Sequence, residues 1–136
     1  MTTLCWALAA SFSAGYFFYE YSDLQTRQIG VPIKANVKLE YSNDTVQWFN
    51  GTKIISGTTL LNLTLMIADV NYTVSSGGAL VDSINQIKNA GDSFWMWWTW
   101  TPYGWIQGSV ACDKYIVSNE EILCWHYGPY GIQPSA

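Results

Sequence analysis

The stretch Ser93-Phe94-Trp95-Met96-Trp97-Trp98-Thr99-Trp100 decides the fold, because it is almost continuously aromatic and has the pattern of one strand. Successive side chains of a strand point to opposite faces. One face should carry Trp95 and Trp97, and the other Phe94, Met96, Trp98 and Trp100. Both faces are apolar, whereas a strand of a small two-layer domain usually has one face in water. The second face must therefore be covered by more of this protein, by a partner chain or by a ligand.

The rest of the chain has the pattern of short strands around one helix. Apolar and polar residues alternate over 33–41, which predicts a half-buried strand. Ser56-Gly57-Thr58-Thr59 offers hydroxyl caps for a short helix ending near Asp69, although its Thr and Leu content also allows a strand. Asn43-Asp44 and Asn50-Gly51 are typical of turns. Further strands are predicted over 46–49, 52–55, 71–74, 79–87, 105–107, 110–117 and 122–127. The expected fold class is α+β.

The first nineteen residues carry no charge and are apolar or small from Leu4 to Tyr19. A transmembrane helix needs about 17–25 such residues. The aromatic end of the segment is typical of a membrane interface. Three readings stay open: a signal anchor, a processed helix that bundles in a filament as in pilin-like subunits, or a buried core element. The predicted division is an apolar anchor or filament-core helix (1–19), a linker (20–32), a β-rich domain (33–127) and an irregular tail (128–136).

Four Asn-X-Ser/Thr sequons lie within about thirty residues behind this apolar segment. Such a cluster favours an exported glycoprotein, although chance in a Thr- and Asn-rich region is the alternative. The candidate glycosylation sites are Asn43, Asn50, Asn62 and Asn71.

Three cysteines are present, with Cys5 in the apolar segment. Cys112 and Cys124 flank what the pattern predicts to be a hairpin. In an exported chain they are expected to form a disulfide, and two buried free thiols are the alternative.

The composition argues against several function classes. Charged residues make up only 12% of the 136 residues, the net charge is −4, and the six basic residues are scattered, so a nucleic-acid partner is not expected. His126 is the single histidine, which leaves no readable metal site. Glu120-Glu121 is most simply a solvated turn, and Gly77-Gly78 lacks the phosphate-binding pattern. We expect no enzyme activity and no cofactor.

The order of motifs from residue 37 to residue 127 resembles the C-terminal domain of transcobalamin and intrinsic factor, and equally a set of uncharacterised bacterial and archaeal surface domains of that type. The matching positions are Gly57, Leu60, Leu61, Gly78, Val81, Ser83, Ile84, Asn85, Trp95, Gly108, Tyr115 and Trp125. The chain departs from the pattern at Thr101-Pro102-Tyr103-Gly104 and at Asn119-Glu120-Glu121. The resemblance implies a β-grasp-like mixed sheet crossed by one helix. In vitamin-binding relatives this domain closes over cobalamin, held against a helical barrel that these 136 residues do not include.

The aromatic residues remain as the candidate site. Tyr and Trp bury large areas at low entropy cost and supply much interface energy. We therefore predict an exported structural or interaction subunit of the cell surface, pilus-like in one reading, that associates with itself or with envelope proteins. A membrane-anchored module that binds a small molecule or a glycan, and an accessory subunit of a membrane complex, are the alternatives. The candidate platform, for which core packing is the competing reading, is Trp95, Trp97, Trp98, Trp100, Tyr103 and Trp105.

Overall fold

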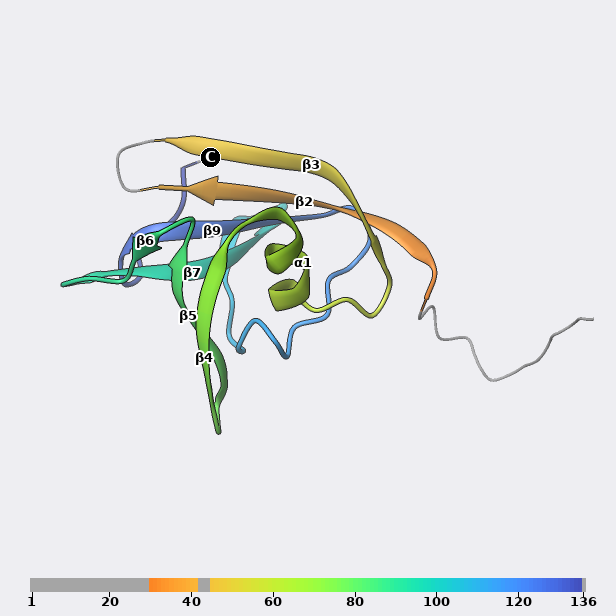
Figure 1. The fold of residues 1–136 in the computed structure, drawn as a ribbon. Coiled ribbons are helices and arrows are strands. Elements are labelled where there is room, and N and C mark those ends of the chain that lie inside the picture. Colours follow the sequence, from red (N-terminus) through yellow and green to blue (C-terminus); the bar gives the residue numbers. More distant parts are fainter. Residues whose placement is uncertain (1–29, 42–44, 136) are drawn as a thin grey trace, which may run out of the picture.

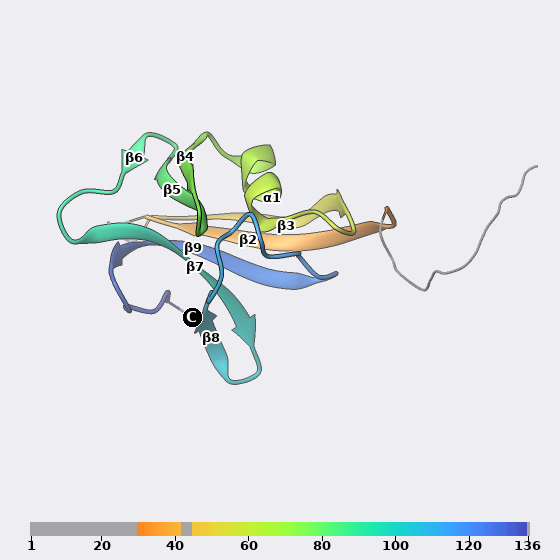
Figure 2. The same cartoon turned by 90° about the horizontal axis from the view of Figure 1, so that it is seen from below.

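The computed structural model describes residues 30–41 and 45–135, and the predicted N-terminal apolar helix lies outside them. The described residues form two layers. A five-stranded sheet makes one layer, and helix α1 with a three-stranded sheet covers one face of it (Figure 1, Figure 2). The elements are β2 (Pro32–Glu40), β3 (Val46–Ile55), α1 (Leu60–Ile67), β4 (Val70–Ser75), β5 (Gly78–Ile84), β6 (Ile87–Lys88), β7 (Ser93–Thr101), β8 (Gly104–Gln107) and β9 (Glu121–Pro129).

The large sheet has the order β3-β2-β9-β7-β8. The pair of β2 and β9 is parallel and the other pairs are antiparallel, so the sheet is mixed. The small sheet has the order β4-β5-β6 and is antiparallel. Mixed sheets with one short helix among the described residues agree with the predicted α+β class.

The apolar face of strand β2 is as predicted, because Ala35, Val37 and Leu39 are fully buried against the helix layer. The strand is not half-buried at its end, however, because Lys38 and Glu40 on the other face are buried as well. The predicted hairpin turn at Asn50-Gly51 is wrong. Strand β3 runs through both residues, and the pairing register shifts between Ala35 and Val37. Gly51 takes a φ of +65° there and donates its backbone N–H to Asn36 Oδ1 at 2.9 Å. The Asn-Gly pair makes a bulge, which also needs a left-handed residue.

Helix α1 begins where it was predicted. Its N-cap is Thr59, whose Oγ1 accepts a hydrogen bond from the backbone N–H of Asn62 at 3.2 Å. The strand predicted over 110–117 is wrong, because this segment is a loop that completes the cap. The first-turn N–H groups of Leu60 and Leu61 donate to the carbonyls of Tyr115 and Cys112 at 2.9 and 3.0 Å. Helix N–H groups without an intrahelical partner need such acceptors.

The extended segment predicted over 79–87 is divided in two. Asn85 and Gln86 have φ values of 50° and 69°, and they form a tight turn between β5 and β6. Two left-handed residues in succession are what a type I′ hairpin turn requires. A hydrogen bond from Asn85 Nδ2 to Tyr41 Oη, 2.8 Å long, ties this turn to the end of β2.

The main core fills the space between the large sheet and the helix layer. Trp125 on β9 is 2% exposed, and its Nε1 donates to Thr64 Oγ1 of α1 at 2.8 Å. That hydroxyl donates in turn to the carbonyl of Leu60 at 2.7 Å. The helix is therefore fixed to the sheet by packing and by a buried polar chain.

The predicted disulfide between Cys112 and Cys124 is not formed, and both are buried free cysteines. Cys112 belongs to the main core, whereas Cys124 packs with Trp98 and Trp105 on the opposite face of the large sheet. The expected hairpin that would have joined them does not exist, because β9 pairs with β2 and β7.

Candidate functional site: the open face of the large sheet

The aromatic strand is covered on both faces only at its centre, and by different means, because Phe94 and Trp100 on the second face are 39% and 43% exposed. Trp95 and Trp97 enter the main core, where their Nε1 atoms donate to the carbonyls of Ile87 at 2.8 Å and Val110 at 3.0 Å. Trp98 packs on the other face with Trp105 and Cys124. The second cover is provided by this protein itself, through β8 and the C-terminal tail.

The six predicted platform residues are thus not one exposed surface. Four of them are core residues: Trp95, Trp97, Trp98 and Trp105 are at most 8% exposed. Trp100 is 43% exposed, and Tyr103, at the β7–β8 turn, is 94% exposed as expected. The rings of Trp100 and Trp105 pack at a steep angle of 70°, with centroids 5.1 Å apart. The predicted platform is therefore reduced to Trp100 and Tyr103, supported by Trp105.

Sequence reasoning missed a third exposed ring, Trp48 on β3. Trp48 is paired with Lys38 of β2, which is paired in turn with Cys124 of β9, opposite Trp98. These four residues form one row across the sheet, on the face away from α1. We call this surface the aromatic face and define it by Trp48, Lys38, Trp98, Trp100 and Trp105, with Tyr103 at its edge. The strand around Trp48 was predicted, but its neighbours across the sheet could not be.

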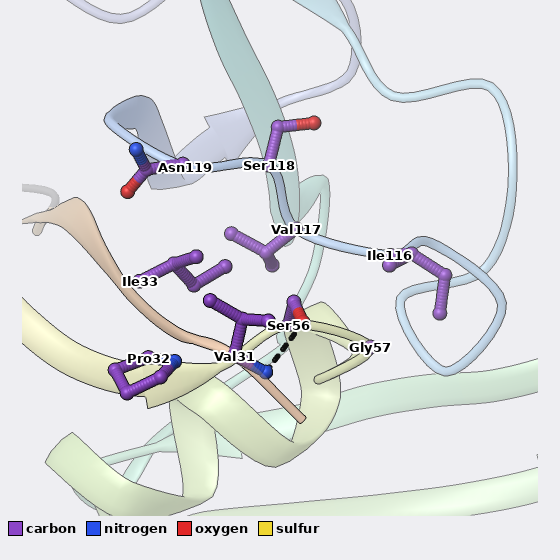
Figure 3. A pocket seen from close by; sticks show the side chains of 9 residues that line it. All are labelled: Val31, Pro32, Ile33, Ser56, Gly57, Ile116, Val117, Ser118 and Asn119. Atoms are coloured by element: carbon purple, nitrogen blue, oxygen red, sulfur yellow. Dashed lines mark hydrogen bonds between the residues drawn. The ribbon is translucent and has the colours of Figure 1, made fainter. Parts of the chain in front are cut away.

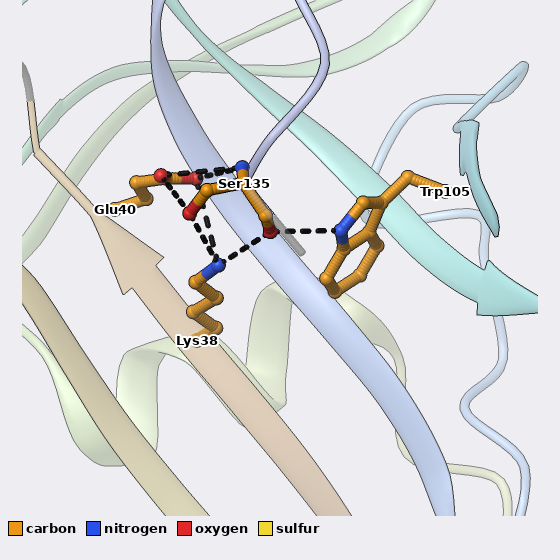
Figure 4. A network of polar contacts seen from close by, with 4 residues as sticks. All are labelled: Lys38, Glu40, Trp105 and Ser135. Atoms are coloured by element: carbon orange, nitrogen blue, oxygen red, sulfur yellow. Dashed lines mark hydrogen bonds and ion pairs between the residues drawn. The ribbon is translucent and has the colours of Figure 1, made fainter.

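The buried side chains of Lys38 and Glu40 form a polar network with Ser135 of the tail, which is itself exposed (Figure 4). Their side chains are 3% and 9% exposed and lie 3.8 Å apart. Lys38 Nζ donates to the Ser135 carbonyl at 2.7 Å, and Trp105 Nε1 donates to the same oxygen at 3.0 Å. The backbone N–H and the hydroxyl of Ser135 donate to Glu40 at 3.1 and 2.6 Å. Buried charges need partners of this kind.

The Lys38 ammonium also joins the two halves of the aromatic face. Its Nζ lies 5.7 Å from the ring centroid of Trp48 and 5.7 Å from that of Trp105. A cation within about 6 Å of a ring face is attracted by the ring quadrupole. One buried cation therefore holds an exposed ring of β3 and a buried ring of β8 together.

One donor beneath this cover has no partner. Trp98 Nε1 is the buried side-chain polar atom that lacks a hydrogen bond among the described residues. An unsatisfied buried group costs roughly 1–3 kcal/mol. The packing of Trp98 under the aromatic face therefore leaves one hydrogen-bond donor unsatisfied.

The cysteine thiol of this face is held in its neutral form. Burial raises the pKa of the Cys124 thiol to about 12. In the main core, burial raises the pKa of Cys112 to about 11. Thiols with such pKa values carry little thiolate at neutral pH, which does not favour nucleophilic chemistry.

His126 should make stability depend on pH. Burial, and to a smaller degree Lys38, lowers the pKa of its imidazole, and Glu40 partly opposes the shift. The unfolded chain then binds the proton more tightly, so the free energy of unfolding should fall as the pH drops below about 6.5. Urea titrations from pH 7.5 to pH 5 should show this loss, and His126→Gln should reduce it. An equal loss in the variant would contradict the assignment.

A separate groove lies at the edge where β2 begins (Figure 3). Its volume is about 710 Å³. Ile116 and Val31 are half exposed there, and Ser56 Oγ accepts a hydrogen bond from the Val31 N–H at 3.0 Å. The groove is lined by Val31, Pro32, Ile33, Ser56, Gly57, Ile116, Val117, Ser118 and Asn119. We call it the edge groove.

The described sequon asparagines are all at the surface. Asn50, Asn62 and Asn71 are exposed, on β3, α1 and β4, and Asn43 lies outside the described residues. The hydroxyl residue of one sequon has a second role, because Thr64 is fully buried and bonded to Trp125.

The described residues contain neither a metal centre nor a membrane-spanning helix. They hold no group of three or more His, Cys, Asp or Glu side chains arranged to bind a metal ion. Within the same residues, no helix has the length and hydropathy to cross a membrane.

No family model matches the sequence, and no curated protein matches it. Solved structures share the fold at low identity. Haptocorrin, solved in complex with Cbi, has a TM-score of 0.63 at 14% identity, covering 82% of this chain and 27% of haptocorrin. A Ruminococcus gnavus protein, provisionally described as metal binding, has a TM-score of 0.54 at 14% identity, covering 71% of this chain and 97% of that one. This chain thus corresponds to about a quarter of haptocorrin, and the likeness to the transcobalamin family is one of fold.

Proposed function

We propose that this chain is a non-enzymatic, exported glycoprotein subunit of the cell surface that acts by protein–protein contact through its aromatic face. The observation that carries the proposal is the position of its exposed indoles. Among the described residues the exposed tryptophans are Trp48 and Trp100, and both lie on this one face. Trp and Tyr dominate the energetics of protein interfaces. A contact with a second copy of the chain fits the pilus-like reading of the apolar N-terminal segment.

Two of the four sequons support the same arrangement. Asn62 on α1 and Asn71 on β4 belong to the layer that covers the opposite face of the large sheet (Figure 2). Glycans at these positions would leave the aromatic face free for a partner.

Electron microscopy of native material, with mass spectrometry of its glycopeptides, tests this proposal. Filaments or ordered surface assemblies containing the glycosylated chain are expected. A protein that is unglycosylated and monomeric on the surface would overturn it.

A test of glycosylation at Asn62 needs a substitution that leaves the core intact, because Thr64 of this sequon is buried. Asn62→Gln should remove one glycan's mass and leave the unfolding midpoint nearly unchanged, because Asn62 is exposed. Thr64→Ala should remove the same glycan but also destabilise the fold, since it deletes the hydroxyl that bonds Trp125. An unchanged electrophoretic mass in Asn62→Gln would show that this site is not glycosylated.

A second candidate function, binding of a small molecule, is favoured by the edge groove. Its volume falls within the range typical of ligand pockets, and apolar side chains converge there with a few polar ones. Haptocorrin, which shares the fold, was solved with Cbi. Quenching of intrinsic tryptophan fluorescence by cobinamide, lost on Ile33→Asp, would support this candidate, and no saturable change would exclude that ligand.

A further inference from the structure

We propose that the C-terminal segment 133–135 is exchanged between copies of this chain, so that Pro134 and Ser135 of one copy occupy the Lys38–Glu40–Trp105 site of another. The inference rests on the proposed function, because it supplies the contact between subunits. The segment that fills the site is known, because in the structure residues 133–135 fill the same site of their own chain.

The site binds Ser135 as a peptide residue, through main-chain and side-chain atoms together. Its carbonyl accepts from Lys38 Nζ and Trp105 Nε1, and its N–H donates to Glu40. Its hydroxyl donates to Glu40 at 2.6 Å and accepts from Lys38 at 3.1 Å. Such charge-assisted hydrogen bonds are stronger than neutral ones. None of these contacts depends on which copy delivers the segment.

The residues between β9 and the site contribute little that would hold the segment in its own chain. Tyr130 is 74% exposed and Ile132 is 53% exposed, whereas Pro134 is buried. The chain reverses at Gly131, with a φ of +83°, and one hydrogen bond of 3.3 Å from Ile132 N–H to the Pro129 carbonyl closes this turn. Residues 133–135 are therefore a short bound segment, connected to β9 by an exposed hinge. Such a hinge permits exchange of an element between identical subunits.

The protein concentration should decide between the closed form, in which the segment binds its own chain, and the exchanged form, in which it binds another copy. A tethered segment has an effective concentration on the order of millimolar, so a dilute chain closes on itself. Copies held close together on a surface or in a filament compete with that tether. Because Lys38 and Trp105 belong to the aromatic face, the exchanged segment would add to the interface of the receiving copy.

Two complementary variants of the full chain test the exchange. The receptor variant, Lys38→Met with Glu40→Gln, keeps its tail but loses the charges that bind Ser135. The tail variant ends after Pro129 and keeps the receptor. Each variant alone should show only the association that its aromatic face supports. An equimolar mixture should show, by light scattering, an additional one-to-one complex between the two variants. A mixture without this additional complex at concentrations on the order of 100 μM would overturn the proposal, because a free receptor and a free tail are then both present.

A peptide assay covers the case in which the receptor variant does not fold. A labelled peptide of residues 129–136, acetylated and amidated, should bind the tail variant saturably. Replacing Ser135 by Pro in the peptide removes the N–H and the hydroxyl and should weaken binding about tenfold or more. No saturable binding, or equal binding of the two peptides, would overturn the proposal. Surface assemblies that persist when both assays fail would leave the proposed function standing without exchange.

Discussion

Replacing Trp125 with alanine is expected to lower the free energy of unfolding by about 3–5 kcal/mol, a large part of the stability of a domain this size. Trp125 is 2% exposed in the centre of the main core. The substitution leaves a cavity and also removes the donor to Thr64 Oγ1, so helix α1 loses both packing and its polar link to β9.

Urea unfolding followed by far-UV circular dichroism measures this effect without depending on the lost indole. Tyr103→Ala is the matched control, because this aromatic side chain is 94% exposed and should change stability by no more than about 0.5 kcal/mol. Equal unfolding midpoints for the two variants would show that the core is not arranged as described.

Gly108→Ala is expected to destabilise by about 3 kcal/mol, the upper part of the range for overpacking. A Cβ at Gly108 would lie 2.0 Å from Cε2 of the Trp97 ring. That ring cannot move freely, since it is buried and its Nε1 is bonded to the Val110 carbonyl. The indole must shift, and both the core and the start of the 108–120 loop shift with it.

Gly77→Ala is the control for this prediction. A Cβ there meets only Ser75 Oγ at 4.0 Å, so the substitution should be neutral or slightly stabilising. Thermal unfolding of the two variants in parallel would separate the steric effect from a general effect of alanine. A midpoint for Gly108→Ala at or above that of the parent chain would contradict the close packing of Gly108 on Trp97.

The sequence allowed good prediction wherever local pattern and burial agree. The alternation over 33–41 predicts β2, and the hydroxyl run before Leu60 predicts the cap at Thr59. Gly108 is one of the positions that match the family pattern. Its close contact with Trp97 explains why a residue without a side chain is needed there. These features depend on neighbours in sequence or on a single buried face.

The errors arose where distant residues decide the structure. Asn50-Gly51 suits a hairpin turn and a bulge equally well, and pairing with β2 selects the bulge. The residues over 110–117 alternate as in a strand, but they form a loop. In this loop the carbonyls of Cys112 and Tyr115 accept hydrogen bonds from the N-terminus of α1. Lys38 looks like a solvent-facing strand residue, but two indole rings and the tail, 97 positions later in the chain, lie against its ammonium group. No local signal in the sequence predicts that contact.

The most direct test of the central claim, that the aromatic face is the interaction surface, is the self-association of the full glycosylated chain by sedimentation velocity. The face variant is Trp48→Ala with Trp100→Ala and Tyr103→Ser. The control is Val74→Ser with Leu80→Ser, two exposed apolar residues of the small sheet at 66% and 62% exposure. Loss of hot-spot aromatics should weaken association roughly tenfold or more in the face variant alone. Unchanged association in the face variant, or an equal loss in both, would contradict the claim.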